Sequence, residues 1–233
     1  MAKVYLSPSD QTANKYAYGG TNEAVVCRKI ADAAALALKR CGFEVKNNKT
    51  ASMTARIAES NKWGADLHVP IHTNAYNGKV TGTRLFCWNK NGEGYKASLA
   101  IFNTLAPLTP GTSESITARQ DLAELRDTNA PCCYIEVDFH DVKDVAKWLI
   151  ENVEAIGEAI AKGICNYYGK AYVPPKTEEY SIVLGKYGTR KEADAVLGGI
   201  YERISSVEAA LSEAHNALDE LETVLRKAQI VTG

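Results

Sequence analysis

The chain has 233 residues, of which 45% are hydrophobic and 24% are charged, and its formal net charge is −1. This length allows one well-buried domain of ordinary size together with an additional segment. The charge balance gives no overall basic field that would indicate a nucleic-acid partner and no acidic excess that would indicate disorder.

Short apolar runs bounded by polar turns alternate with segments in which apolar residues recur at helical spacing. A polar loop leads into the first helix, which begins near Glu23, with Thr21 or Asn22 as its cap, and ends at Cys41-Gly42. Strands are predicted at residues 4–6, 43–45, 65–72, 82–88 and 132–139. Further helices are predicted at residues 54–63, 95–105 and 144–168.

This alternation through residue 168 predicts an α/β fold, in which a mostly parallel twisted sheet is flanked by helices on both faces. In such sheets, ligands bind beyond the carboxyl ends of the strands. We therefore expect the functional residues at strand ends and at the turns that lead from strands into helices.

The rest of the chain has a different pattern. A linker with adjacent prolines, AYVPPKTEEY, is followed by a short strand-like piece at 180–184. From Ala193 onward, apolar residues recur at strict 4-3 spacing over about five heptads, with Leu or Ile at every a position, which is typical of a coiled coil. A helix that packs back on the first domain is the alternative, but it usually has a wider apolar face. We expect a first domain at 1–170, a linker at 171–188 and a helix at 189–230 that forms a homo-oligomer.

The N-terminal residues MAKVYLSPSD lack the apolar segment of a signal peptide, and no run approaches the length of a transmembrane helix. We expect a soluble protein that is made in the cytoplasm and reaches the outside only if something else releases it. The six cysteines are irregularly spaced and include no CxxC pair. They are predicted to be reduced and buried.

Three side chains from distant segments fall at strand ends or at the start of a helix: Glu23, His72 and Glu136. Asp138 lies on the same side of its strand as Glu136. A buried carboxylate is costly unless it is paired, protonated or bound to a metal. A histidine and two carboxylates that converge here would form a zinc-hydrolase site, whereas capping acids and a buried core histidine are the alternative.

His68 and His72 are four residues apart in DLHVPIHTNAYNG. On a strand they share a face but lie about 13 Å apart. One zinc ion cannot bind both, because its bonds are about 2 Å long. We expect His68 to be a buried, hydrogen-bonded side chain.

Several segments resemble, in order and spacing, the zinc-dependent N-acetylmuramoyl-L-alanine amidases of the amidase-3 type. IHTNA at 71–75 resembles the family's S-I-H-x-N-A segment, and LRDTNAPCCYIEVDFHD at 125–141 resembles L-R-x-t-x-x-P-a-x-L-v-E-x-G-F. VYLSPSDQ takes the place of the first strand and the D-P-G-H-G turn, and GTRLFCW that of the G-v-x-x-y-y strand. The resemblance covers roughly residues 1–170.

The resemblance implies a prophage- or endolysin-like enzyme that uses Zn²⁺ to hydrolyse the amide between N-acetylmuramic acid and L-alanine in peptidoglycan, acting on the cell wall after release. By this resemblance, His72 and Glu23 match zinc ligands, and Glu136 matches the catalytic glutamate. Its partners would be the stem peptide and the glycan, with no nucleic acid. Arg84 and Arg126, if they face the cleft, are expected to bind stem-peptide carboxylates; we also assign Asn74 to substrate binding, although it fits a role in the strand-end turn.

One departure from the family concerns its first histidine, where this chain reads SPSDQ. Asp10 is the natural substitute, because aspartate can bind zinc. Gln11, His140 and water are the other candidates for the third ligand. If this ligand is lost, the alternative function is a non-catalytic peptidoglycan-binding protein on an amidase scaffold; hydrolysis of another small amide is a further alternative.

Overall fold

The computed structural model describes residues 1–176 and 189–231. The chain divides into two compact units, Met1–Lys176 and Thr177–Gly233. The strand-like piece predicted at 180–184 lies outside the described residues.

The first unit is built on a six-stranded sheet in the order β2-β1-β3-β6-β4-β5. The strands are β1 (Lys3–Pro8), β2 (Glu44–Asn47), β3 (Leu67–Asn74), β4 (Arg84–Cys87), β5 (Ser115–Ala118) and β6 (Tyr134–Phe139). Strands β2, β1, β3 and β6 are parallel, whereas β4 runs antiparallel to β6 and β5 runs parallel to β4. The prediction of a mostly parallel sheet is therefore confirmed.

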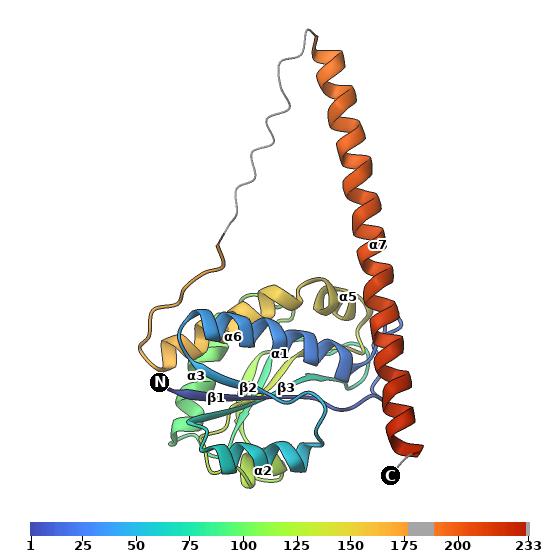
Figure 1. Ribbon diagram of the computed structural model, residues 1–233. Coiled ribbons are helices and arrows are strands. Elements are labelled where there is room, and N and C mark those ends of the chain that lie inside the picture. Colours follow the sequence, from blue (N-terminus) through green and yellow to red (C-terminus); the bar gives the residue numbers. More distant parts are fainter. Residues whose placement is uncertain (177–188, 232–233) are drawn as a thin grey trace. The chain divides into compact units, whose positions relative to one another are not determined.

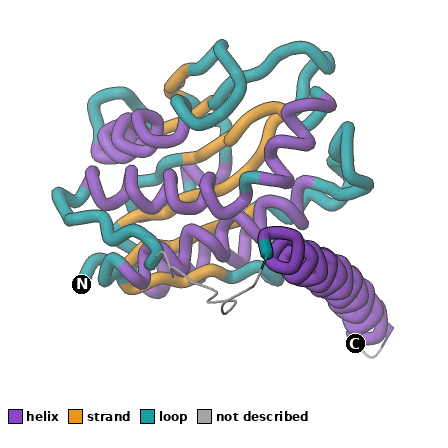
Figure 2. Tube along the Cα trace, turned by 90° about the horizontal axis from the view of Figure 1, so that it is seen from above, coloured by secondary structure: helices purple, strands orange, loops and turns teal. Residues whose placement is uncertain are grey.

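Helices cover both faces of this sheet, as predicted. They are α1 (Glu23–Arg40), α2 (Met53–Trp63), α3 (Glu93–Leu105), α4 (Ala123–Arg126), α5 (Lys143–Glu151) and α6 (Val153–Tyr167). Helices α1 and α6 pack together over one face, and α2 lies on the other (Figure 1). Figure 2 shows the same layers from above, with the helices lying across the strands.

The main hydrophobic core lies between the sheet and the layer that contains α1 and α6. On β3 and β6 it takes in the side chains of Val69, Ile71, Ile135 and Val137. Because successive side chains of a strand point to opposite faces, the intervening residues of both strands point toward the face that α2 covers. All six cysteines are free and buried, which confirms that prediction.

The capping signals of α1 act as expected. Asn22 accepts a hydrogen bond from the backbone N–H of Val25 and begins α1 directly before Glu23. Helix α2 begins with Ser52 as its cap and ends at Gly64, whose φ of 67° lies in the left-handed region that favours glycine.

The single helix predicted at 144–168 is wrong, because two helices, α5 and α6, meet at Asn152. At Asn152 the backbone leaves the helical conformation (φ −117°, ψ 22°), and both its backbone N–H and its side-chain amide donate to the carbonyl of Trp148, at 3.0 and 2.8 Å. After this break α6 approaches α1 so closely that a Cβ atom on Gly157 would lie 2.5 Å from the Cβ of Ala33. The sequence analysis also missed β5 and α4, each of which has only four residues.

In the second unit, the described residues include one helix of 42 residues, α7 (Arg190–Val231). Several of its large apolar side chains are exposed, among them Leu197, Ile204, Val207 and Leu211. In the part of the chain that is described, no helix combines the length and apolar character needed to cross a membrane.

Candidate functional site

His72 and Glu136 lie side by side near the carboxyl ends of β3 and β6. The two residues are register partners on neighbouring parallel strands, so their side chains point to the same face of the sheet. Glu23, at the first position of α1, accepts a hydrogen bond from His72 Nδ1 at 2.8 Å. The structure thus brings together the three side chains that the sequence singled out, at the edge where ligands bind to such sheets.

The loop before α1 holds the Glu23 carboxylate from the other side. Asn14 donates a hydrogen bond to Glu23 Oε2 at 2.7 Å and another to Gln11 Oε1 at 2.7 Å. Burial works to raise the pKa of Glu23, but the hydrogen bonds from His72 and Asn14 hold it below its ordinary value. Burial works to lower the pKa of His72, but Glu124 and Glu23 raise it. Without a metal, the two side chains therefore form a buried ion pair.

Glu136 has a different environment. Its Oε2 atom is buried and has no hydrogen-bond partner among the described residues. Burial raises the pKa of Glu136 to about 8, although the positive charges of His72 and Arg119 act in the opposite direction. A carboxylate with one unpaired oxygen and a raised pKa is suited to accept and return a proton near neutral pH.

Asp10 lies in the loop after β1 and points toward the start of α2. Its carboxylate accepts a hydrogen bond from the backbone N–H of Met53 at 3.2 Å and lies 3.8 Å from Arg56 Nη2. The structure therefore does not bring Asp10 to the Glu23–His72 pair. Across residues 1–176 and 189–231, no three His, Cys, Asp or Glu side chains are gathered in a metal-binding arrangement.

The other two candidates for a third ligand are also engaged elsewhere. The amide oxygen of Gln11 is held by Asn14. The imidazole of His140 is buried, shares a hydrogen bond of 2.9 Å with Thr73 Oγ1 and stacks on Tyr16 with ring centroids 4.9 Å apart. These are the hydrogen bonds of the two side chains among the described residues, although His140 is near enough for the charge of Glu23 to act on it.

The predicted substrate-binding residues occupy different positions. Arg84 is the register partner of Glu136 across β4 and β6, and its Nη2 atom donates to Ser113 Oγ at 2.6 Å. Asn74 ends β3, where its Oδ1 atom accepts a hydrogen bond from the N–H of Ala75. Arg126 is exposed and pairs with its chain neighbour Asp127 at 2.8 Å. Of these three predicted substrate-binding residues, Arg84 is the one that lies beside Glu136 on a neighbouring strand.

Asp138 has a local role. Its Oδ1 atom accepts hydrogen bonds from the backbone N–H groups of Gly82 and Phe139, both at 2.7 Å. These contacts bind the side chain to the local backbone.

Glu124 of α4 is the site residue that the sequence analysis missed. Its Oε1 atom accepts a hydrogen bond from Ser7 Oγ and lies 3.2 Å from His68 Nε2, whereas its Oε2 atom lies 3.8 Å from His72 Nε2. Burial would raise the pKa of Glu124, but the two histidines lower it to about 2. No motif or periodicity marks this glutamate, because α4 is a single turn.

Glu124 belongs to a buried network that also contains Ser7, Arg56, Ser60 and His68. Arg56 Nε donates to Ser7 Oγ at 2.8 Å. His68 Nδ1 shares a hydrogen bond of 2.9 Å with Ser60 Oγ, which confirms the prediction of a buried, hydrogen-bonded histidine. The network thus anchors one oxygen of Glu124, whereas its other oxygen, Oε2, has no hydrogen-bond partner among the described residues.

The donor atoms around His72 fit a zinc ion in part. An imidazole and a carboxylate are ordinary zinc ligands, and Glu23 and His72 provide them in contact. Three buried polar atoms of this cluster have no hydrogen-bond partner among the described residues, although such atoms are normally paired: His72 Nε2, Glu124 Oε2 and Glu136 Oε2. Glu23 and His72 can provide two of the protein ligands of a zinc ion. A third protein ligand requires another side chain to move toward them.

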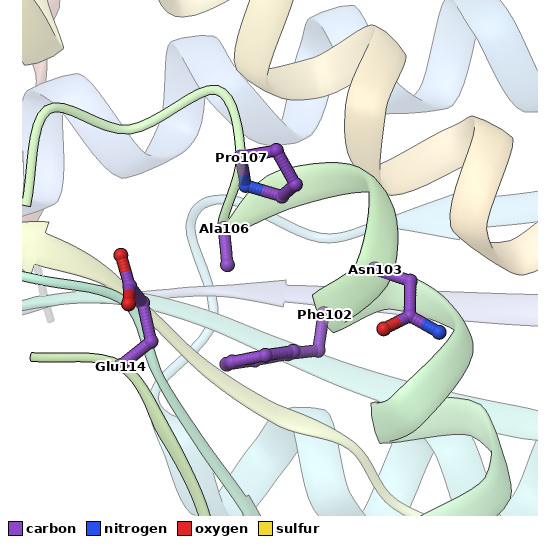
Figure 3. A pocket seen from close by; sticks show the side chains of 5 residues that line it. All are labelled: Phe102, Asn103, Ala106, Pro107 and Glu114. Carbon is purple, nitrogen blue, oxygen red and sulfur yellow. The ribbon is translucent and has the colours of Figure 1, made fainter. Parts of the chain in front are cut away.

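The site does not coincide with the pocket in Figure 3, which has a volume of about 300 Å³. Its lining residues come from the end of α3 and the region before β5: Phe102, Asn103, Ala106, Pro107 and Glu114. None of these belongs to the cluster around His72, so the pocket and the candidate site are separate.

A family model for N-acetylmuramoyl-L-alanine amidase (Amidase_3) matches residues 7–166, which is more than half of the chain. The match extends from the end of β1 through nearly all of α6. No curated protein sequence matches the chain.

Solved structures of amidases have the same fold as the first unit. The catalytic domain of CwlV from Bacillus (Paenibacillus) polymyxa is 17% identical with a TM-score of 0.66, covering 73% of this chain and 100% of that one. An N-acetylmuramoyl-L-alanine amidase from Clostridium difficile 630 is 22% identical with a TM-score of 0.66, covering 72% and 97%. The catalytic domain of the CD27L endolysin, which targets Clostridia difficile, is 20% identical with a TM-score of 0.58, covering 71% and 96%.

Proposed function

The chain belongs to the N-acetylmuramoyl-L-alanine amidase family, and we propose that Glu23, His72 and Asp10 hold a zinc ion in it while Glu136 transfers the proton. The enzyme hydrolyses the amide between N-acetylmuramic acid and L-alanine in peptidoglycan. The family is generally zinc-dependent. Because peptidoglycan lies outside the cytoplasmic membrane, we further propose that the enzyme acts after release from the cell, as an endolysin does.

The contact of 2.8 Å between His72 Nδ1 and Glu23 Oε1 carries the zinc proposal. It joins an imidazole and a carboxylate from two elements that are 49 residues apart in the chain. Such a pair at the carboxyl edge of the sheet offers two zinc ligands and leaves the metal accessible to substrate.

Asp10 can complete the set through a change of rotamer. Ser9, directly before it, donates a backbone hydrogen bond to the carbonyl of Ile71 at 2.9 Å, so the loop runs beside His72. The Asp10 side chain is 39% exposed, and it can therefore leave the N–H of Met53 without disturbing the core. This rotation is the step that the proposed third ligand requires.

Glu136 performs the proton transfers in this proposal. A bound zinc ion polarises the scissile carbonyl and lowers the pKa of a bound water. Glu136 Oε2, which is unpaired, takes a proton from the attacking water and gives it to the leaving nitrogen of L-alanine as the amide C–N bond breaks. The ring of Tyr134 stacks on His72 with centroids 4.7 Å apart and fixes the plane of the imidazole.

We also propose that Arg84, Arg126 and Asn74 contact the stem peptide or the glycan. Arg84 is supported by its position opposite Glu136 and by a buried Nη1 atom without a hydrogen-bond partner among the described residues. A guanidinium with a free N–H group is suited to bind a peptide carboxylate.

Metal analysis of the purified chain tests the proposed function. We expect about one zinc ion per chain, loss of stem-peptide release from purified peptidoglycan after chelation, and recovery when zinc is returned. His72→Gln should lose both zinc and activity, because it removes an imidazole ligand. His140→Gln is the matched control and should keep both, since His140 is held by Thr73. A chain that binds peptidoglycan without zinc and without turnover would support the non-catalytic alternative.

We propose that α7 joins copies of the chain through a coiled coil. Leu197, Ile204 and Leu211 fall at a positions of the heptads, and Val207 falls at a d position. All four are exposed on this helix, and packing a matching seam from a second copy would bury them. Linked copies would bind a polymeric wall more tightly through their high effective concentration.

Ile204→Lys is expected to convert the oligomer to monomer, because a charge in the seam must be desolvated. Light scattering coupled to size-exclusion chromatography measures the change. Glu202→Lys, at an outward position of the preceding heptad, is the control and should keep the wild-type mass. A wild-type chain that is monomeric at all concentrations would refute the coiled coil.

A further inference from the structure

We propose that Glu124 is a positioning residue, which holds the imidazole of His72 through Nε2 and so directs Nδ1 toward the metal. This inference rests on the proposed role of His72 as a zinc ligand. It assigns a function to a glutamate that no sequence motif marked and that lies on the short helix α4.

The two nitrogens of His72 face two different carboxylates. Nδ1 lies 2.8 Å from Glu23 Oε1, and Nε2 lies 3.8 Å from Glu124 Oε2. The second distance is that of an ion pair rather than a hydrogen bond. Both His72 Nε2 and Glu124 Oε2 are buried and have no hydrogen-bond partner among the described residues. A movement of less than about 1 Å would bring them to hydrogen-bond distance.

The other oxygen of Glu124 is already fixed. Glu124 Oε1 accepts the Ser7 hydroxyl and lies 3.2 Å from His68 Nε2. Ser7 is itself held by Arg56 Nε at 2.8 Å. With Oε1 anchored in this way, Oε2 is the free atom of a carboxylate that is only 1% exposed, and it is directed at His72.

This arrangement explains the histidine spacing of DLHVPIHTNAYNG. His68 and His72 share one face of β3 and are too far apart to bind one metal ion. One carboxylate between them contacts both rings, Oε1 on the side of His68 and Oε2 on the side of His72. On the other side of the His68 ring, Ser60 Oγ lies 2.9 Å from Nδ1 and holds the ring in place.

The chemical consequence concerns the tautomer of His72. A histidine that binds metal through one nitrogen normally donates its other N–H to a carboxylate or carbonyl, which fixes the ring and raises its basicity. Glu124 is the carboxylate in position to accept that proton. Loss of such a partner typically lowers metal affinity about 10–100-fold.

Zinc affinity, measured by competition with a chromogenic chelator, tests the proposal in the full chain. Glu124→Gln removes the negative charge, and Glu124→Asp keeps the charge but withdraws Oε2 from His72. We expect both variants to bind zinc about 10–100-fold more weakly than the wild type. Glu59→Gln is the matched control: it is the same chemical change at a carboxylate that bonds Tyr5 and Asn48, and it should leave zinc affinity unchanged. Wild-type affinity in both Glu124 variants would overturn the proposal.

Nitrogen-15 NMR of the histidine rings gives a second readout that needs no variant. In the zinc-bound wild type we expect Nε2 of His72 to carry a proton that exchanges slowly with water. A metal-bound or unprotonated Nε2 would overturn the proposal even if both Glu124 variants failed to fold.

The same spectrum separates this inference from the proposed function. If the wild type binds no zinc, the metal proposal fails, but the Nε2 proton can still be observed in the metal-free chain. Slow exchange of that proton in the wild type would then support a hydrogen bond from His72 Nε2 to Glu124. Fast exchange would overturn the proposed role of Glu124.

Discussion

Replacing Glu136 by Gln is expected to lower the rate of stem-peptide release by about 10²–10⁴-fold, the usual contribution of a general acid–base group. Gln has the same shape but cannot accept a proton. Burial raises the pKa of Glu136 to about 8, which means that the surrounding protein disfavours its ionised form. The neutral amide removes that cost, so we expect the variant to unfold at the same temperature as the wild type or at a higher one.

Release of stem peptides from purified peptidoglycan and calorimetric unfolding measure these two effects on the same samples. Glu44→Gln is the matched control, because it makes the same change at an exposed position on β2 of the same sheet. It should keep wild-type activity. Activity near that of the wild type in Glu136→Gln would contradict the assignment of proton transfer to this residue.

Replacing Arg56 by Met should lower the free energy of unfolding by about 3–5 kcal/mol, the typical cost of removing one partner from a buried charged network. Arg56 is 1% exposed and donates to Ser7 Oγ at 2.8 Å and to the carbonyl of Ala51 at 2.5 Å. Methionine fills much of the volume but donates no hydrogen bond. The Ser7–Glu124 pair then loses the cation that supports it.

Denaturant unfolding followed by tryptophan fluorescence measures this loss. The three tryptophans, Trp63, Trp88 and Trp148, all lie in residues 1–176, so the signal reports on the first unit. Lys62→Met is the control, since it removes an exposed positive charge from the last turn of the same helix, α2, and should have little effect. A difference below about 1 kcal/mol for Arg56→Met would show that the network is not a major source of stability.

The sequence and the structure agree best where the signal is a run of apolar residues. Five of the six strands were predicted near their observed places, because each contains an apolar run that is bounded by polar or glycine-containing turns. The errors are local. The helix at 144–168 divides at Asn152, where the backbone leaves the helical conformation, and β5 and α4 are too short to show a period.

The residues of the candidate site likewise differ in whether the sequence alone could predict them. Glu23, His72 and Glu136 could be found from the sequence, because an acid or a histidine at the end of a buried strand or the start of a helix is unusual and matches a family motif. The direction of the Asp10 side chain could not, since it depends on the N–H of Met53, 43 residues away. That Asp10 completes the zinc site therefore stays a prediction.

By itself, the sequence determined the fold class, the family and the principle that His68 and His72 cannot share one metal ion. These follow from local patterns and from the fixed rise of a strand, which need no knowledge of distant residues. Only the tertiary structure decided what lies between the two histidines. Glu124 follows His68 by 56 residues, and its position depends on the folding of α4 against the sheet. Contacts of that kind arise from the packing of whole elements, which no spacing within a single segment records.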